Sequence, residues 1–181
     1  MGGPGPNHSG PMSKFLLGVI VGVGLVIGGG YWCVTRGRMP VAVTSKPLPF
    51  ERWIARTSLR AAVGADADKP SPLPADEANL LAGAKIYEAR CSGCHGELGH
   101  PASAFAKSIF PHAPQLLPPR KGVTDDPVGE TYWKVKNGIR LSGMPEFGDS
   151  LTDAEMWQVS LMLLHADQLP DSVRQALRRN Q

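Results

Sequence analysis

Two cysteines and a histidine lie within five residues of one another in the stretch CSGCH. They are Cys91, Cys94 and His95, and the chain contains one other cysteine, Cys33. Residues of these types at this spacing can serve three chemistries: a structural zinc site, a dithiol redox centre, or the covalent attachment of haem. The residues around the motif separate these possibilities.

A structural zinc site needs a second pair of ligands, but Cys33 lies in an apolar run. The other histidines are scattered along the chain, at His8, His100, His112 and His165. A thioredoxin-like dithiol needs alternating strands and helices around it, whereas a helical pattern precedes this motif and a loop rich in glycine and proline follows it. The motif therefore favours haem, whose vinyl groups would accept the two thiols while the adjacent imidazole reaches the iron.

Helical patterns before and after the motif predict the elements that position it. Asp76 can cap a helix that leads into the motif, and Gly83 on this helix leaves room for a second backbone. A second helix is expected from about residue 126 to Gly138, and a third opens with the capping box of Thr152 and Glu155. No convincing strand pattern occurs. Residues 76–168 are therefore predicted to form a small all-α domain, followed by a tail, residues 169–181, that has room for a short helix.

An apolar segment near the N-terminus has the length of a membrane span. Residues 15–34 contain no charge, and 20 helical residues reach about 30 Å, the thickness of the hydrocarbon layer. Signal peptides have a shorter apolar region, followed by a cleavage site of the pattern small-x-small. The residues that follow this segment include Arg36 and Arg38 and do not fit that pattern. We therefore predict an uncleaved single transmembrane helix, preceded by a disordered N-terminus, residues 1–14.

Charge is distributed unevenly along the chain, whose formal net charge is +3. Residues 76–168 carry 8 basic and 12 acidic side chains, so the excess of positive charge lies outside this domain. Basic flanks around an apolar segment indicate a membrane surface, and we expect no nucleic-acid partner.

The intervening residues 35–75 read as a linker rich in proline and arginine. Within it, residues 49–63 form a possible amphipathic helix, because Trp53 and Ile54 share a face while Arg52, Arg56 and Arg60 recur every four residues on another. Such a helix could lie at the bilayer surface or pack on the domain.

From residue 76 onward the chain resembles the single-haem members of the class I cytochrome c family. The resemblance covers about residues 76–167 and rests on three motifs in the family's order: a helix leading into CSGCHG, the stretch YWKVKNGIRLSGMPEFG, and a last helix built around LTDAEMWQVSLML. It implies the cytochrome c fold, one covalently attached haem c, and Met144 as the second axial ligand of the iron, opposite His95. The long connection of residues 99–120 departs from the family pattern.

The chemistry of Met144 agrees with that implied role. A soft thioether favours ferrous haem and so raises the reduction potential. Met156 and Met162 fall on the last helix and are expected to fill the core, while His100 or His112 would make a bis-histidine site the alternative.

The family also orients its ligand histidine on a proline carbonyl, for which Pro111 and Pro114 are both candidates. Arg140 is a candidate partner for a haem propionate or a solvated loop residue. Trp133 and Trp157 are expected to pack against the haem.

The expected function is one-electron transfer, because an enzyme or sensor needs an open position on the iron. The resemblance implies a respiratory carrier and not an enzyme, with redox partners such as a terminal oxidase, a quinol-oxidising complex or a dehydrogenase. The alternative is a peroxidase-like or gas-binding subunit with a displaceable methionine. The basic residues after the span would keep the domain in the cytoplasm, but c-type haem domains generally lie outside it. We therefore expect a single-pass protein of the inner (cytoplasmic) membrane with its haem domain on the periplasmic side.

Overall fold

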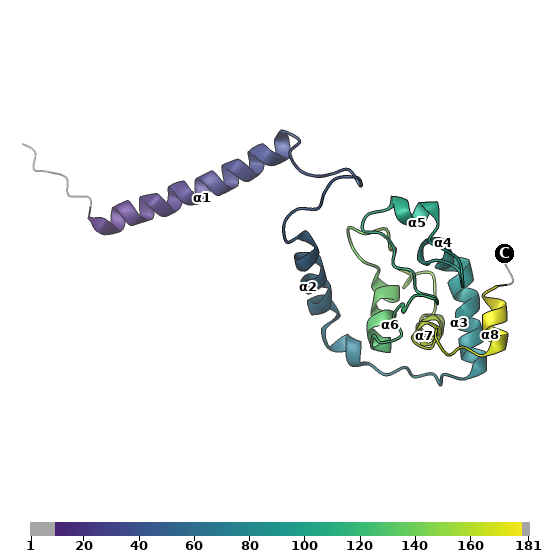
Figure 1. Ribbon diagram of the computed structural model, residues 1–181. Helices are drawn as coiled ribbons and strands as arrows, with labels where there is room; N and C mark the ends of the chain where they lie inside the picture. Colours follow the sequence, from purple (N-terminus) through teal and green to yellow (C-terminus); the bar gives the residue numbers. More distant parts are fainter. Residues whose placement is uncertain (1–9, 179–181) are drawn as a thin grey trace, which may run out of the picture. The chain divides into compact units, whose positions relative to one another are not determined.

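The computed structural model describes residues 10–178, and within this range every regular element is a helix. The all-α fold expected from the sequence is confirmed. The chain divides into two units, residues 1–49 and residues 50–181, each described here by itself (Figure 1). Residues 1–9 of the N-terminus predicted to be disordered, and residues 179–181 of the predicted tail, lie outside the described range.

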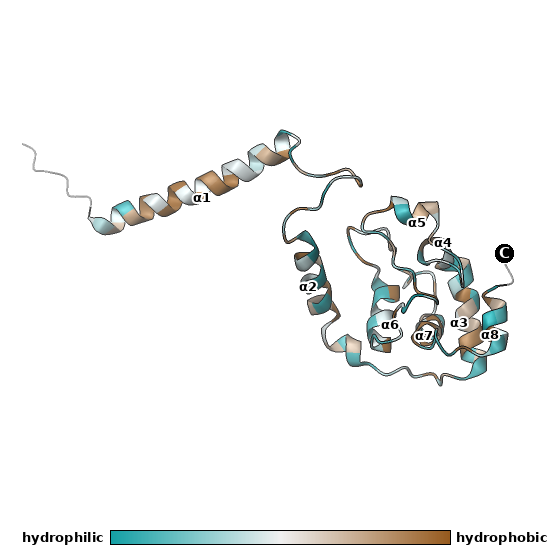
Figure 2. Ribbon diagram, in the orientation of Figure 1, coloured by the Kyte–Doolittle hydropathy of each residue, from teal (hydrophilic) through white to brown (hydrophobic). Residues whose placement is uncertain are grey.

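The first unit contains one long helix, α1, which runs from Pro11 to Thr35. It begins four residues before the predicted span, with Pro11 at a position where a missing backbone N–H costs no hydrogen bond. None of its residues is buried, and hydrophobic residues recur along its whole length (Figure 2). By length and composition α1 could cross a bilayer.

The second unit holds the other described helices. In chain order they are α2 (Glu51–Val63), the 3₁₀ helix η1 (Gly64–Asp68), α3 (Glu77–Arg90), α4 (Ser92–His95), α5 (Ala104–Ser108), α6 (Val128–Asn137), α7 (Asp153–Leu164) and α8 (Asp171–Ala176). The three helices predicted around the motif are α3, α6 and α7. The predicted caps of α3 and α7 are present: Asp76 accepts a hydrogen bond from the backbone of Asn79 at 2.9 Å, and Thr152 and Glu155 form a reciprocal capping box.

The core lies where α3 packs against α7. Leu80, Ala84 and Tyr87 of α3 meet Met156 and other buried residues of α7 in one hydrophobic cluster. The two backbones approach closely at Gly83, where an added Cβ would overlap the carbonyl oxygen of Gln158. A residue without a side chain is therefore required at this crossing, as the sequence predicted.

Two flanking segments extend this core beyond the predicted haem region. One of these segments is α8 with the residues next to it. Three of its side chains belong to the same cluster and are each at most 1% exposed: Leu169 before the helix, Val173 within it and Leu177 after it. On the other side η1 lies against α6, because a Cβ on Gly129 would meet the carbonyl oxygens of Ala67 at 2.6 Å and of Lys69 at 2.8 Å. Part of the predicted linker thus packs on the domain.

Candidate haem site

The CSGCH motif forms the end of α3 and the single turn α4. Cys91 caps α3, and its carbonyl oxygen accepts hydrogen bonds from the backbone N–H groups of Cys94 at 3.1 Å and His95 at 2.9 Å. Both thiols are free and half-buried. Burial and the neighbouring Cys94 raise the pKa of the Cys91 thiol to about 12, so this thiol is neutral in the chain as folded.

The ring of His95 is oriented by a backbone carbonyl. Its Nδ1 lies 2.8 Å from the carbonyl oxygen of Pro114, which can only accept, so Nδ1 carries the proton and the lone pair of Nε2 is free. Burial lowers the pKa of His95 below its ordinary value, although the hydrogen bond to Pro114 opposes this shift. The imidazole is therefore neutral, the state that binds a metal. Of the two prolines that the sequence left open, the structure selects Pro114.

The residues after Pro114 bind the backbone of the motif. The backbone N–H of Leu116 donates to the carbonyl oxygen of His95 at 3.1 Å, and the side-chain amide of Gln115 donates to that of Cys94 at 3.4 Å. Residues 114–116 thus hold both the ring and the main chain of His95. The sequence offered no signal for Gln115, because its contact joins segments that are 21 residues apart.

Tyr87 fixes the residue that follows the histidine. Its hydroxyl donates to the carbonyl oxygen of Gly96 at 2.6 Å, and the side chain is fully buried. Gly96 has φ +87°, and a Cβ there would overlap Oε1 of Gln115. The sequence placed Tyr87 on the buried face of its helix, but it did not predict this hydrogen bond.

Met144 lies half-buried in an ordered loop that follows α6. Its backbone N–H donates to the Ser142 hydroxyl at 3.2 Å, and its carbonyl oxygen accepts from Ile139 at 3.2 Å. The loop folds back on the end of α6 at Gly138, which has φ +64° and where an added Cβ would lie 2.7 Å from the backbone nitrogen of Glu146, so a side chain is excluded there. The backbone around Met144 is therefore fixed by short-range hydrogen bonds.

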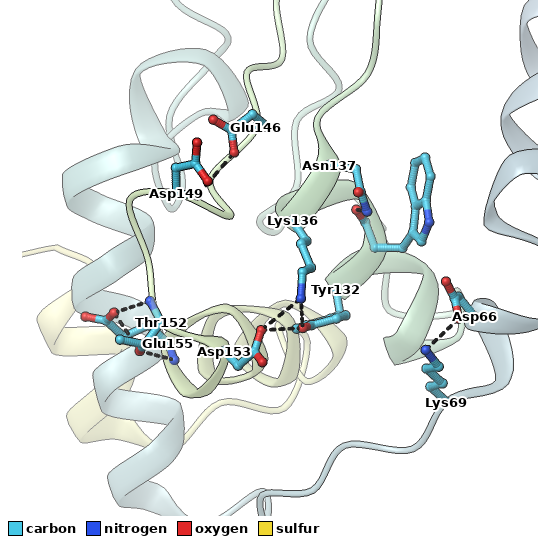
Figure 3. A network of polar contacts seen from close by, with 11 residues as sticks. Asp66, Lys69, Tyr132, Lys136, Asn137, Glu146, Asp149, Thr152, Asp153 and Glu155 are labelled. Atoms are coloured by element: carbon cyan, nitrogen blue, oxygen red, sulfur yellow. Dashed lines mark hydrogen bonds and ion pairs between the residues drawn. The ribbon is translucent and has the colours of Figure 1, made fainter.

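Trp157 of α7 stacks on Tyr132 of α6, with ring centroids 4.0 Å apart and planes inclined by 9°. The Tyr132 hydroxyl donates to Asp153 at 2.7 Å, and Lys136 reaches the same carboxylate at 3.1 Å (Figure 3). This network joins α6 to the start of α7. Trp133, the neighbour of Tyr132, is half-buried.

Comparison with known proteins assigns the domain. Residues 78–161 match the family described as cytochrome c oxidase, cbb3-type, subunit III. The domain is a class I c-type cytochrome. The quinohemoprotein alcohol dehydrogenase ADH-IIG of Pseudomonas putida is 30% identical over 100 residues, which cover 55% of this chain and 12% of that protein. The chain thus spans about an eighth of the length of this curated relative, and no solved structure matches it significantly.

A class I c-type cytochrome binds haem c, with its iron, through covalent bonds. The residues of this cytochrome fit that group, because Cys91 and Cys94 are both unpaired and His95 presents a free Nε2. When bound, haem c supplies one-electron chemistry between ferric and ferrous iron.

The other methionines and histidines that the sequence offered as ligands lie in different surroundings. Met156 and Met162 are 1% and 0% exposed in the α3–α7 core, as the sequence predicted. His100 and His112 are both exposed, and Nδ1 of His112 lies 2.9 Å from the carbonyl oxygen of Ile109, so the bis-histidine alternative stays open. Arg140 is exposed and forms no ion pair with the residues that the structure describes.

A cavity of about 430 Å³ borders His95, Gln115, Lys107 and Arg120. Neither thiol of the motif nor Met144 lines it.

Proposed function

We propose that this protein is a membrane-anchored, single-haem cytochrome c that transfers single electrons between respiratory-chain partners, with its iron held by His95 and Met144. The observation that carries the proposal is the hydrogen bond from His95 Nδ1 to Pro114, which leaves Nε2 free as one axial ligand. Met144 supplies the other, because hydrogen bonds fix the backbone of its loop while the methionines of α7 fill the core.

An iron with two protein ligands suits a carrier, because it has no open position for a substrate or a gas. Each residue contributes in a distinct way. The cysteines attach the cofactor, Pro114 sets the ring orientation, and the thioether of Met144 favours the ferrous state and so raises the reduction potential. When haem c is bound, Trp133 and Trp157 would pack beside it, and Arg140 would pair with a propionate.

Partners and location follow from the anchor and the relatives. Helix α1 holds the protein in the inner membrane, with the haem domain on the periplasmic side. The match of residues 78–161 to a family described by a terminal-oxidase subunit, and the likeness to a segment of a dehydrogenase, support an oxidase, a quinol-oxidising complex or a dehydrogenase as partner. The protein is a carrier, either free in the membrane plane or fixed in such a complex.

Spectroscopy of the purified protein tests this function. The ferric form should show the weak near-infrared sulfur-to-iron charge-transfer band of a methionine ligand. The ferrous form should bind carbon monoxide poorly, because both axial positions are filled. Avid binding by the unmodified protein would instead favour a haem enzyme or sensor.

A further inference from the structure

Helix α2 gains little from the domain to which it is attached. Of its 13 residues only Val63, at the C-terminal end, is buried, and Leu59 is half-buried. An isolated helix of this length is marginal in water, since most helical stability in proteins comes from packing an apolar face. Most of the surface of α2, including the side chains of Trp53 and Ile54, is therefore left exposed by the described residues.

The exposed part carries an apolar face. Phe50, Trp53, Ile54 and Thr57 stand at the spacing i, i+3, i+4 and i+7, which places them on one side of a helix. The three large side chains among them are 76%, 66% and 54% exposed, in chain order. Phe50 also has φ +65°, a conformation uncommon for a bulky residue, at the point where α2 begins. Three large apolar side chains exposed to water at the start of one helix favour its association with an apolar surface.

A row of positive charge borders this face. Arg52, Arg56 and Arg60 recur every four residues and are all exposed. Residues 36–63 contain six basic side chains and one acidic one, whereas residues 76–168 contain 8 and 12. Positive charge is thus concentrated in the part of the chain that follows α1 directly.

We propose that α2 binds the surface of an anionic phospholipid bilayer. Trp53 and Ile54 insert at the boundary of the acyl chains, and the three arginines contact lipid phosphates, the arrangement typical of interfacial helices. The inference rests on the membrane anchor of the proposed function. Residues 36–50 connect α1 to α2 and can extend to about 50 Å, which is enough to let α2 lie on the bilayer that α1 crosses.

We favour lipid over a protein partner because α2 combines a row of arginines with an exposed tryptophan, Trp53. Arginine stems can lie along apolar surface while their guanidinium groups reach phosphate. The consequence concerns the haem domain. Because η1 follows α2 without a break and packs on α6 at Gly129, a bound α2 restricts the orientations that the domain can adopt at the membrane.

Amide hydrogen exchange of the full-length, haem-loaded protein tests the proposal. The protein is placed in nanodiscs of phosphatidylcholine alone, or of phosphatidylcholine mixed with phosphatidylglycerol. Exchange across residues 51–63 should be at least about fivefold slower in the anionic discs, the factor that one arginine near such a surface supplies. Exchange in α3 should be the same in both.

Two variants separate the contributions. Arg52→Gln, Arg56→Gln and Arg60→Gln together should abolish the dependence on phosphatidylglycerol, and Trp53→Ser with Ile54→Ser should abolish the protection in either lipid. A matched control removes the same charge from exposed positions of the haem domain, through Lys85→Gln, Lys107→Gln and Arg120→Gln, and should leave the protection of α2 unchanged. The haem absorbance spectrum shows that each variant is folded.

Three outcomes would overturn the proposal. The first is equal exchange of α2 in both lipids, and the second is full protection in the triple arginine variant. The third is protection that arises only when a soluble redox partner is added, which would assign α2 to a protein interface. Failure of the protein to enter phosphatidylcholine discs would instead contradict the anchor on which the inference rests.

Discussion

At the scale of single residues, the haem site depends on groups held in place by hydrogen bonds from other segments. His95 is held through its ring by Pro114 and through its carbonyl oxygen by Leu116. The hydrogen bonds of Met144 to other described residues are made by its backbone, within its own loop. We therefore expect the methionine to be the easier of the two proposed ligands to remove without loss of the fold.

Met144→Ala should remove the near-infrared band, open the iron to carbon monoxide and lower the reduction potential, because the thioether that favours ferrous iron is gone. The control is Met156→Ala, which should cost about 2 to 5 kcal/mol of packing and leave the ligand field intact. Absorbance spectra and redox titration measure both variants. An unchanged band in Met144→Ala would contradict the ligand assignment.

Tyr87→Phe should destabilise the domain by about 1 to 3 kcal/mol, because it leaves the buried carbonyl oxygen of Gly96 without its donor. Burial raises the pKa of Tyr87 far above its ordinary value, so this loss should not vary with pH in the neutral range. Denaturant unfolding at several pH values measures the change. A stability equal to that of the unmodified protein would show that the bond contributes nothing.

At the scale of elements, the crossing of α3 over α7 sets the distance between the haem motif and the rest of the core. The caps at Asp76 and Thr152 begin both helices, and Gly83 lets their backbones touch. The motif follows α3 without a break, so a displacement of α3 also moves the two thiols and the ligand histidine.

Gly83→Ala should destabilise the domain by about 1 to 3 kcal/mol or more, because the new methyl group overlaps the backbone of α7 at Gln158. Lys85→Ala, on the exposed side of the same helix, should change the stability by about 0.5 kcal/mol at most. Thermal unfolding of the two haem-loaded variants compares them. Equal midpoints would mean that the helices do not cross at this glycine.

At the scale of the whole molecule, the chain combines an apolar helix, a basic segment and an acidic haem domain. The haem domain alone determines neither the location of the protein nor the side of the membrane on which the domain lies. Both depend on whether α1 remains uncleaved and on which way it inserts.

An alkaline phosphatase fused after Gln181 should be active, and a reporter that works only in the cytoplasm should be silent. The purified protein should retain Met1 or Gly2, because we propose that α1 is an anchor and not a signal peptide. Reporter assays and N-terminal mass spectrometry decide both points. A mature N-terminus near Val41 would contradict the anchor, and cytoplasmic activity would contradict the orientation.

A chain that begins at Pro74 and is exported by a foreign signal should be soluble and keep its haem spectrum, because the proposed ligands all follow it. It should be less stable than a chain that begins at Phe50, since it loses η1 and the buried Val63, a side chain whose burial stabilises by about 1.5 to 3 kcal/mol. Denaturant midpoints of the two chains measure the difference. Loss of haem from the shorter chain would place η1 within the haem-binding unit.

The features that could be predicted from sequence are those carried by residues close together in the chain. The spacing of Cys91, Cys94 and His95 identified the cofactor, and the capping residues located α3 and α7. These signals are local, because a cap binds the backbone within three or four residues and the haem motif occupies about one helical turn.

Only the tertiary structure chose Pro114 over Pro111, paired Tyr87 with Gly96, and stacked Tyr132 on Trp157. Most of these contacts join residues brought together by the fold, and several chemically equivalent partners were available for each. Which partner is used depends on how the segments pack, because a hydrogen bond or a ring contact needs a separation correct to a few tenths of an ångström, and no local pattern determines that distance.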